Sequence, residues 1–444
     1  MMEDALAPWV TTVPAHWHVR RLGSVANVIF SNVDKHVLQS EVPVRLCNYT
    51  DVYKNDRVTS TIDFMHASAL PREIEKFQVR KDDVLATKDS EDPNDIAVSS
   101  LIAEDLPGVL CGYHLAMVRP DQELLCGPFL AWVQASKKIR AQYEACAVGV
   151  TRFGLGQSAF KSVYLPLPPL LEQRRIASYL DEQTAKIDRL MDLRRRQMEL
   201  LKEQRAAIIQ QAVTRGLNPD SPMKDSGLPW LREIPAHWAV KRLKYLTPQV
   251  TVGIVINPSS HYVESGIPCL RSLNVNPGEL LTGELVFINE SSHRLLSKSA
   301  IYHGDIVAVR TGQPGTTAVV DERFHNANCI DLIIIRRSRH FVSEYVQLLL
   351  NSSFARSQFD SGSDGAIQQH FNIQTAKNLV VLLPPLEEQE DILRFIEHSN
   401  ARLDALFTAY SRQLDVLSEY RAALIHECVT GQRRVGEMID SEAL

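Results

Sequence analysis

The sequence has 444 residues, of which 45% are hydrophobic and 23% are charged, values typical of a globular chain with room for two or more domains. Its seven cysteines form no Cys-x-x-Cys pair, which favours reduced thiols over disulfides or a zinc site. No run of about 18 uncharged apolar residues occurs, and Met1-Met2-Glu3-Asp4 lacks a signal-peptide pattern. We therefore expect a cytoplasmic protein without a membrane contact. The net charge of −5 is not typical of a nucleic-acid binder.

A turn motif opens the chain and returns near its middle. Pro14-Ala15-His16-Trp17, which follows Pro8-Trp9, reappears 221 residues later as Pro235-Ala236-His237-Trp238 after Pro229-Trp230. Neither histidine has a second metal ligand at the usual spacing. We therefore predict that His16 and His237 belong to a turn that a buried tryptophan fixes.

Each motif precedes a mixed region of about 160 residues that is predicted to be rich in strands. In the first region, residues 83–88 and 115–119 are apolar runs that end on a basic residue. In the second region, residues 301–310 and 331–336 show the same pattern. Elsewhere the two regions share little, which predicts a repeated scaffold that carries different loops.

A long polar helix is predicted after each region, beginning at Pro168-Pro169 and at Pro384-Pro385. The shared pattern Pro-Pro-Leu-x-Glu-Gln starts both helices, 216 residues apart. Residues recurring every seven positions predict a coiled-coil seam in both helices. The apolar seam residues are Leu180, Ile187, Leu201 and Ile208 in the first helix, and Ile396, Leu403, Leu417 and Leu424 in the second.

Charge predicts how the two helices pair. Residues 170–215 contain 10 Lys/Arg and 7 Asp/Glu, whereas residues 386–431 contain 4 and 9. Helices of opposite charge prefer each other to copies of themselves, so we expect an antiparallel pair within one chain, with a pseudo-two-fold axis between the halves. Arg205 and Arg421 occupy matching seam positions, where we expect them to bond to carboxylates or to helix ends in a structural role.

Several catalytic patterns are missing from the sequence. It has no Asn-Pro-Pro-aromatic motif of an adenine methyltransferase and no Gly-x4-Gly-Lys-Ser/Thr phosphate loop. Asn218-Pro219-Asp220 lacks the acid-x-Lys partner of a restriction-nuclease core. No metal-binding or catalytic residues are therefore predicted, and we expect that the chain is not an enzyme.

Two turn motifs and two Pro-Pro-Leu-x-Glu-Gln helix starts, alternating with two divergent regions, resemble the specificity subunit of Type I restriction-modification systems. The resemblance covers essentially the whole chain. It implies an α+β fold in which two strand-rich target-recognition domains alternate with two long helices that pair as an antiparallel coiled coil. The domains implied are residues 1–167 (first recognition domain), 168–216 (first helical spacer), 217–383 (linker and second recognition domain), 384–431 (second spacer) and 432–444 (tail).

The resemblance also implies a function and partners. Each domain would read one half of a gapped, asymmetric site on double-stranded DNA, and the helices would set the gap and dock two methyltransferase subunits. S-adenosylmethionine, ATP and Mg²⁺ are expected on those subunits and on the motor-endonuclease subunits, and no cofactor is expected on this chain. DNA methylation and restriction would be carried out by the partners.

Candidate DNA-contacting residues come from loops that follow the predicted strands. Arginine, glutamine and asparagine there can bond to base edges, and glycines allow the backbone to approach closely. The candidates are Asn48, Tyr49, Lys88, Thr151 and Arg152 in the first region, and Asn274, Arg310, Thr311, Gln313, Gln368, Gln369 and His370 in the second.

Two other interpretations remain open on the sequence alone. A scaffold could use the paired helices to display two protein-binding domains, and it would bind no DNA sequence specifically. A stand-alone methyltransferase or nuclease with degenerate motifs would bind its cofactor as an isolated chain.

Overall fold

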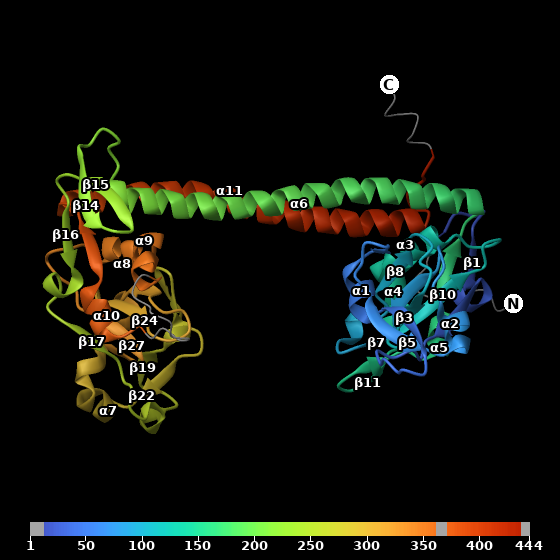
Figure 1. The fold of residues 1–444 in the computed structure, drawn as a ribbon, viewed down its shortest axis with the longest axis horizontal. Coiled ribbons are helices and arrows are strands. Elements are labelled where there is room, and N and C mark those ends of the chain that lie inside the picture. Colours follow the sequence, from blue (N-terminus) through green and yellow to red (C-terminus); the bar gives the residue numbers. More distant parts are fainter. Residues whose placement is uncertain (1–12, 361–370, 437–444) are drawn as a thin grey trace. The chain divides into compact units, whose positions relative to one another are not determined.

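The computed structural model describes residues 13–360 and 371–436. The chain divides into two compact units, one formed by residues 1–194 with 411–444 and the other by residues 195–410. Each unit combines a strand-rich region with a part of both long helices, α6 (Leu170–Arg215) and α11 (Leu386–Val429), which run side by side in Figure 1. The helices have 46 and 44 residues.

The first unit contains a five-stranded sheet with the order β2-β10-β6-β8-β4 and a three-stranded sheet with the order β5-β3-β9. A smaller sheet, β11-β12-β7, and the ribbon β1-β13 complete it. The strands are β1 (His18–Arg21), β2 (Ala26–Phe30), β3 (Val42–Cys47), β4 (Arg57–Val58), β5 (Met65–Ala69), β6 (Val84–Thr87), β7 (Asp89–Ser90), β8 (Ser99–Ile102), β9 (Val109–Cys111), β10 (Leu115–Pro120), β11 (Val148–Gly149), β12 (Phe153–Gly154) and β13 (Tyr164–Leu167). The helices are α1 (Tyr49–Lys54), α2 (Pro71–Phe77), α3 (Gly127–Ala135), α4 (Lys137–Glu144) and α5 (Gln157–Ser162).

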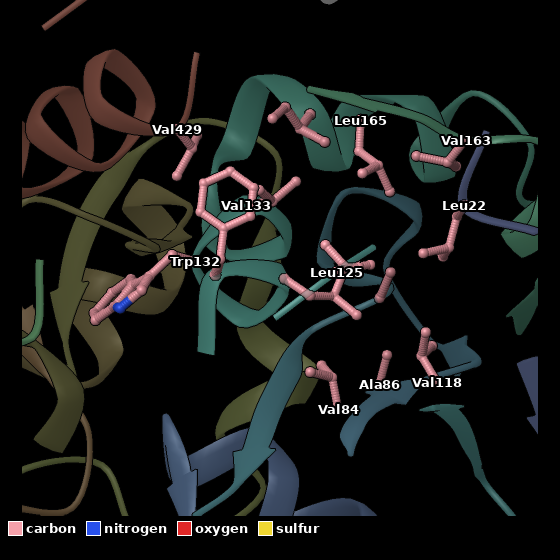
Figure 2. Packing of buried hydrophobic residues seen from close by; sticks show 14 of the residues in the cluster. Leu22, Val84, Ala86, Val118, Leu125, Trp132, Val133, Val163, Leu165 and Val429 are labelled. Carbon is pink, nitrogen blue, oxygen red and sulfur yellow. The ribbon is translucent and has the colours of Figure 1, made fainter. Parts of the chain in front are cut away.

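The main core of the first unit joins the sheet to the helices. Apolar side chains of β6 and β10 pack under α3, and Val429 of α11 lies beside Trp132 and Val133 of α3 (Figure 2). Leu180 and Leu424 extend the same core into the helix pair. Burying apolar area is the main stabilising contribution to such a core, so the helix pair and the sheet support each other.

The second unit has a four-stranded sheet with the order β17-β27-β24-β25 and a five-stranded sheet with the order β18-β22-β19-β26-β23. The hairpins β14-β15 and β20-β21 and the ribbon β16-β28 accompany them. The strands are β14 (Met223–Leu228), β15 (Leu231–Pro235), β16 (Ala239–Arg242), β17 (Val250–Val252), β18 (Tyr262–Val263), β19 (Ile267–Leu270), β20 (Val275–Asn276), β21 (Glu279–Leu280), β22 (Val286–Ile288), β23 (Ala300–Ile301), β24 (Ile306–Val309), β25 (Thr317–Val319), β26 (Ala327–Cys329), β27 (Leu332–Ile335) and β28 (Val380–Leu383). The helices are α7 (Glu290–Leu295), α8 (Ser343–Asn351), α9 (Ser353–Asp360) and α10 (Ile373–Asn378).

The strands expected from the apolar runs are present. The run 83–88 contains β6 and the run 115–119 lies in β10, while the second region supplies β24 and β27 at the matching places. β6 pairs with β10, and β24 pairs with β27, both antiparallel. The two units therefore share a central strand pair, although their outer strands differ.

The long helices begin where the sequence predicted, directly after the two Pro-Pro pairs. Leu180, Ile187 and Leu424 belong to the core of the first unit, and Ile396 belongs to that of the second. Leu180, Ile187, Leu424, Ile396 and Leu403 are buried, while Leu201, Ile208 and Leu417 are half-buried. The coiled-coil pairing expected from the heptads is therefore observed in both units.

Side-chain contacts fix the direction of the helices. In the second unit the ammonium of Lys202 lies 5.9 Å from the ring centroid of Phe407, and Arg205 pairs with Asp404. Moving forward along α6 from Lys202 to Arg205 thus moves backward along α11 from Phe407 to Asp404, so the helices are antiparallel.

The seam arginines have the expected partners. Arg421 Nε donates to Asp188 Oδ1 at 2.9 Å in the first unit, as Arg205 pairs with Asp404 in the second. Asp188 and Asp404 are the same position of the 216-residue repeat, as are Arg205 and Arg421. Of the two kinds of partner expected for these arginines, carboxylates and helix ends, the structure shows carboxylates in both units.

Candidate nucleic-acid interface

The repeated turn motif closes each strand-rich region against the start of a long helix. In the first unit, β1 pairs with β13, and His16 Nε2 lies 3.0 Å from Glu172 Oε2 in the first turn of α6. Trp17 is buried, and its indole N–H donates to His16 Nε2 at 3.1 Å. The predicted role of His16, part of a turn fixed by a buried tryptophan, is confirmed.

The second unit repeats this junction with the same residue types. β16 pairs with β28, and His237 Nε2 lies 2.7 Å from Glu388 Oε2. The indole N–H of the buried Trp238 donates directly to Glu388 Oε1 at 3.0 Å. The glutamate of the shared Pro-Pro-Leu-x-Glu-Gln pattern therefore has a structural role, because its carboxylate bonds to side chains of the turn motif.

The glutamine of the same pattern also bonds within its unit. Gln173 donates to Pro168 O at 2.8 Å and accepts from Cys126 N at 2.8 Å. Gln389 donates to Pro384 O at 2.9 Å and accepts from Val342 N at 2.8 Å. Both glutamines are fully buried, so these bonds replace the water that the backbone groups give up on folding.

A glycine ends each long helix against the tryptophan of a turn motif. Gly431 has a φ of +73°, and a Cβ there would lie 2.4 Å from Pro14 Cδ and 3.1 Å from the ring of Trp17. Gly216 has a φ of +74°, and a Cβ there would lie 3.3 Å from the ring of Trp238. The end of α11 thus packs on the first turn motif, and the end of α6 packs on the second.

The opposite ends of each central strand pair differ in character. At one end, a buried aspartate bonds to an arginine: Arg119 to Asp83 at 2.7 Å, and Arg336 to Asp305 at 2.5 Å. The other end carries Lys88 after β6 in the first unit and Arg310 after β24 in the second. These loop ends hold most of those predicted DNA-contacting residues that the structure describes.

The loop end of the first unit gathers charged and aromatic side chains around Asp89. Arg152 Nη2 lies 2.6 Å from Asp89 Oδ1 and 3.1 Å from His114 Nδ1, and His114 Nδ1 lies 2.9 Å from Asp89 Oδ2. The ammonium of Lys88 lies 4.4 Å from the ring centroid of Tyr113. The group Tyr49, Lys88, Asp89, Tyr113, His114 and Arg152 is called here the first loop surface.

Burial and ion pairing shift the pKa values of side chains in this surface. Burial lowers the pKa of Lys88, while the hydrogen bond to Asp89 raises the pKa of Arg152. Burial also raises the pKa of Tyr49, which stacks on Tyr53 with ring centroids 5.5 Å apart. Arg152 remains a cation with a side chain that is 57% exposed, so it can still meet an anionic or acceptor group outside the protein.

The sequence did not single out several members of this surface. Asp89, Tyr113 and His114 come from β7 and the turn before β10, and they meet Arg152 only because β7 pairs with β12. The hairpin β11-β12 also presents Val148 and Val150, which are 79% and 91% exposed. These valines gave no periodic signal, but two exposed valines in a short hairpin are unusual for a strand with a buried face.

The loop end of the second unit, called here the second loop surface, consists of Arg310, Thr311, Gln313 and Asp331. Arg310 Nη1 lies 2.7 Å from Asp331 Oδ1, and Thr311 Oγ1 lies 3.3 Å from Asp331 Oδ2. Gly312 has a φ of +99°, which favours glycine in this tight loop. Thr311 and Gln313 are exposed.

The other predicted contacts have different outcomes. Asn274 is fully buried, and its side chain accepts from Arg271 N and donates to Gly283 O, so the structure gives it a role in its own turn. Asn48 is half-buried and caps α1 together with Asp51. Thr151 is exposed in the β11-β12 hairpin. Gln368, Gln369 and His370 lie outside the described residues.

The described residues offer no metal site and no membrane span. No group of three or more His, Cys, Asp or Glu side chains in residues 13–360 and 371–436 is arranged to hold a metal ion. Over the same residues, none of the helices combines the length and apolar character that crossing a membrane requires.

Comparisons with known proteins agree with one family. Residues 14–199 match the model of the Type I restriction modification DNA specificity domain. The chain is 24% identical over 336 residues to the Type I restriction enzyme EcoKI specificity subunit of Escherichia coli (strain K12), covering 73% of this chain and 68% of that protein. It is 21% identical over 433 residues to the MjaVIII specificity subunit of Methanocaldococcus jannaschii, covering 95% of this chain and 94% of that protein.

The fold has a counterpart among solved structures. A chain from a structure described as the basis of complex assembly and conformational transition of the type I R-M system superposes with a TM-score of 0.73. The two chains are 18% identical, and the match covers 95% of this chain and 100% of the other. This likeness shows the α+β fold of two strand-rich regions with packed long helices.

The chain combines two strand-rich regions with a shared pair of helices, and it matches the model of a DNA specificity domain. These features define the class of non-catalytic DNA-recognition proteins. The chain belongs to the specificity subunits of Type I restriction-modification systems, as the resemblance of its motifs indicated. It is the non-catalytic DNA specificity component of such a system. The scaffold and the stand-alone enzyme are not supported by these matches.

Proposed function

We propose that the first and second loop surfaces each read one half of a gapped, asymmetric site on double-stranded DNA. The observation that carries this proposal is their equivalent position. Lys88 and Arg310 both follow the central strand of their sheet, and His114 and Asp331 both precede the strand paired with it. Equivalent positions with different residues suit two half-sites of different sequence.

The first loop surface has the chemistry for base readout. Arg152 projects from the β11-β12 hairpin, and an arginine can fork to guanine O6 and N7 in the major groove. Val150, which is 91% exposed, can contact the methyl group of thymine. Lys88 is partly buried between Phe30 and Tyr113, so it is better placed for a phosphate at the edge of the groove.

The second loop surface uses a glycine-rich loop for the same purpose. Asp331 holds one edge of the Arg310 guanidinium, which leaves its remaining N–H groups for a base. Gln313 is exposed and can bond to adenine N6 and N7. We include Thr311 and residues 368–370 (Gln-Gln-His) in the proposal as contacts of the same half-site.

The near-neutral recognition regions limit the share of affinity that this chain supplies. Residues 8–167 contain 17 basic and 18 acidic residues, and residues 229–383 contain 14 and 12. Phosphate neutralisation drives most DNA affinity, so the loop surfaces are proposed to select the sequence while partner subunits add much of the binding energy.

We propose the functional division expected from the sequence: recognition domains at residues 1–167 and 217–383, helical spacers at 168–216 and 384–431, and a tail at 432–444. The two spacers would set the gap between the half-sites. This division follows the repeat of the turn motif and of the Pro-Pro-Leu-x-Glu-Gln helix starts.

If two identical methyltransferase subunits bind this chain, it must offer the same docking surface twice. The partly exposed pairs His16–Glu172 and His237–Glu388 repeat in both units. Exposed apolar positions of the helices also repeat, as Leu190/Leu406 and Leu200/Val416. These repeated residues are the proposed docking surface.

The partners complete the proposed complex. The methyltransferase subunits would bind S-adenosylmethionine and flip out the target adenine, and motor-endonuclease subunits would use ATP and Mg²⁺. The proposed location is the cytoplasm, where the DNA partner is found.

Long-read methylome sequencing tests the proposal. Cells that co-express this chain with its methyltransferase subunit should show one gapped, asymmetric motif with a methylated adenine on each strand. Cells that express the methyltransferase subunit alone provide the control. Absence of such a motif, in cells from which the assembled complex can be purified, would contradict half-site reading.

A further inference from the structure

A basic region lies at the end of the second unit's sheet opposite to Arg310. β24 follows Asp305 and precedes Arg310, and β27 runs antiparallel to it and is followed by Arg336. The side chains that gather at this end come from the short helical turns 297–299 and 322–324, the loops beside them, and the segment after β27. We call Lys298, His303, His325, Arg337, Arg339 and His340 the basic face; all six are exposed.

The basic face lines two neighbouring hollows. One has a volume of about 690 Å³ and is lined by Lys298, His303, His325 and Arg337, among others. The second has a volume of about 430 Å³ and is lined by Arg337, Arg339 and His340, among others. Arg337 and Pro248 line both, so the hollows form a continuous open surface.

Acidic side chains do not neutralise this surface. Asp305 is buried and already bonds to Arg336, and Glu322 lies 3.7 Å from His303. Lys298, Arg337 and Arg339 form no ion pair with another residue of the ranges 13–360 and 371–436. The exposed rings of Tyr245 and Tyr302 stand among the cations.

The first unit carries Arg80 and Lys81 where the second has Tyr302 and His303, but it differs in the segment that follows the paired strand. Asp121 N bonds to Val25 O there, as Ser338 Oγ bonds to Leu246 O in the second unit. That correspondence aligns residues 120, 122 and 123 (Pro, Gln and Glu) with Arg337, Arg339 and His340. Two arginines and a histidine thus stand where the first unit has no cation and carries a carboxylate.

We propose that the basic face binds the phosphodiester backbone of the duplex that flanks the half-site read by the second unit. The surface is open, cationic and mixed with aromatic rings, which suits a polyanion and offers no pocket shaped for a small anion. This inference rests on the proposed function, because it assumes that Arg310 and Gln313 meet the half-site.

The spacing agrees with a flanking contact. A strand of four residues such as β24 rises roughly 13 Å, and neighbouring base pairs are about 3.4 Å apart. The basic face would therefore meet phosphates at least about four base pairs beyond the bases read by the second loop surface. Only this half-site would gain the contacts of Arg337, Arg339 and His340.

The test measures DNA binding by the complex of this chain with its methyltransferase subunit as a function of salt. The probes are a duplex carrying the methylome site, the same duplex cut back beyond the second half-site, and the same duplex cut back beyond the first. The variant is Arg337→Gln with Arg339→Gln. The control is Arg232→Gln, an exposed arginine of β15 that lines neither hollow.

We expect an effect of defined size on the salt dependence, and an effect of duplex length at the second half-site alone. Removing one phosphate contact reduces the slope of log K against log salt by about 1, so the double variant should reduce it by about 2 while the control leaves it unchanged. Cutting the duplex beyond the second half-site should weaken binding by the wild type more than binding by the double variant, which has already lost both arginines of the face. The cut beyond the first half-site should affect both proteins equally.

The outcomes separate this inference from the proposed function. A wild-type complex that prefers its site, together with an unchanged slope for the double variant, contradicts the flanking contact alone. Failure of the double variant to assemble the complex would also contradict it, because the face would then bind an acidic protein surface. A wild-type complex that binds its site no better than a scrambled duplex contradicts half-site reading and the flanking contact together.

Discussion

The two units share the residues of their junctions but differ at the ends of their sheets. In the first unit Glu172 meets His16 and Gln173 closes the helix start; in the second, Glu388 and Gln389 make equivalent bonds. At the loop ends, the first unit carries a hairpin with Arg152, whereas the second carries a glycine-rich loop with Arg310. The fold therefore constrains the junctions, whereas under the proposed function the half-sites to be read constrain the loop ends.

The junction tryptophans give the largest expected effect. Trp17→Ala and Trp238→Ala should each destabilise their own unit by about 3–5 kcal/mol, because each removes a large buried ring. Trp238 is 1% exposed and Trp17 is 6% exposed, so the second substitution should have the larger effect. Hydrogen exchange measured peptide by peptide would locate the destabilised unit.

Phe variants at the same positions provide the control, since they keep most of the apolar volume. Equal reduction of protection in both units from one substitution would contradict the division into separately stabilised units.

The loop ends should respond independently of each other. Arg152→Gln should relax base preference in one half-site and Arg310→Gln in the other, each by about 1–3 kcal/mol, because each would remove the forked hydrogen bond to a base that is proposed for it. Methylome sequencing of each variant measures the change. If one substitution relaxed both halves of the motif, the assignment of one half-site to each unit would be wrong.

The two seam arginines should differ modestly in their contribution. Arg421 bonds to Asp188 and also to Asp56 of the recognition region, and its side chain is 23% exposed. Arg205 pairs only with Asp404 among its described salt bridges and is 38% exposed. Arg421→Ala should cost about 1.5–3 kcal/mol, as hydrogen bonds to charged groups do, and Arg205→Ala less than about 1 kcal/mol.

Urea unfolding of the two alanine variants measures this difference. The control is Arg196→Ala, which removes an exposed charge of the same kind from α6. It should leave the free energy of unfolding nearly unchanged, because surface substitutions away from specific contacts have small effects. Equal destabilisation by Arg205→Ala and Arg421→Ala would contradict the second anchoring contact of the first unit through Asp56.

Much of this organisation follows from the sequence. The repeat of the turn motif and of Pro-Pro-Leu-x-Glu-Gln predicted two equivalent halves, and the heptad positions predicted the buried seam at Leu180 and Leu424. The heptad spacing of apolar residues and the prolines at the helix starts reflect local backbone geometry. They can therefore be interpreted without knowing which distant segments pack together. Opposite charge on the two helices likewise predicted that they would pair.

The composition of the loop ends was decided by tertiary structure. Asp89 and His114 join Arg152 because β7 pairs with β12, and no spacing in the sequence encodes that pairing. Asn274 followed a short strand, as a contact residue would, yet packing buried it and used its amide within its own turn. Local patterns determine which segments become helices and strands, while contacts between distant strands determine which side chains meet and which remain free to bind.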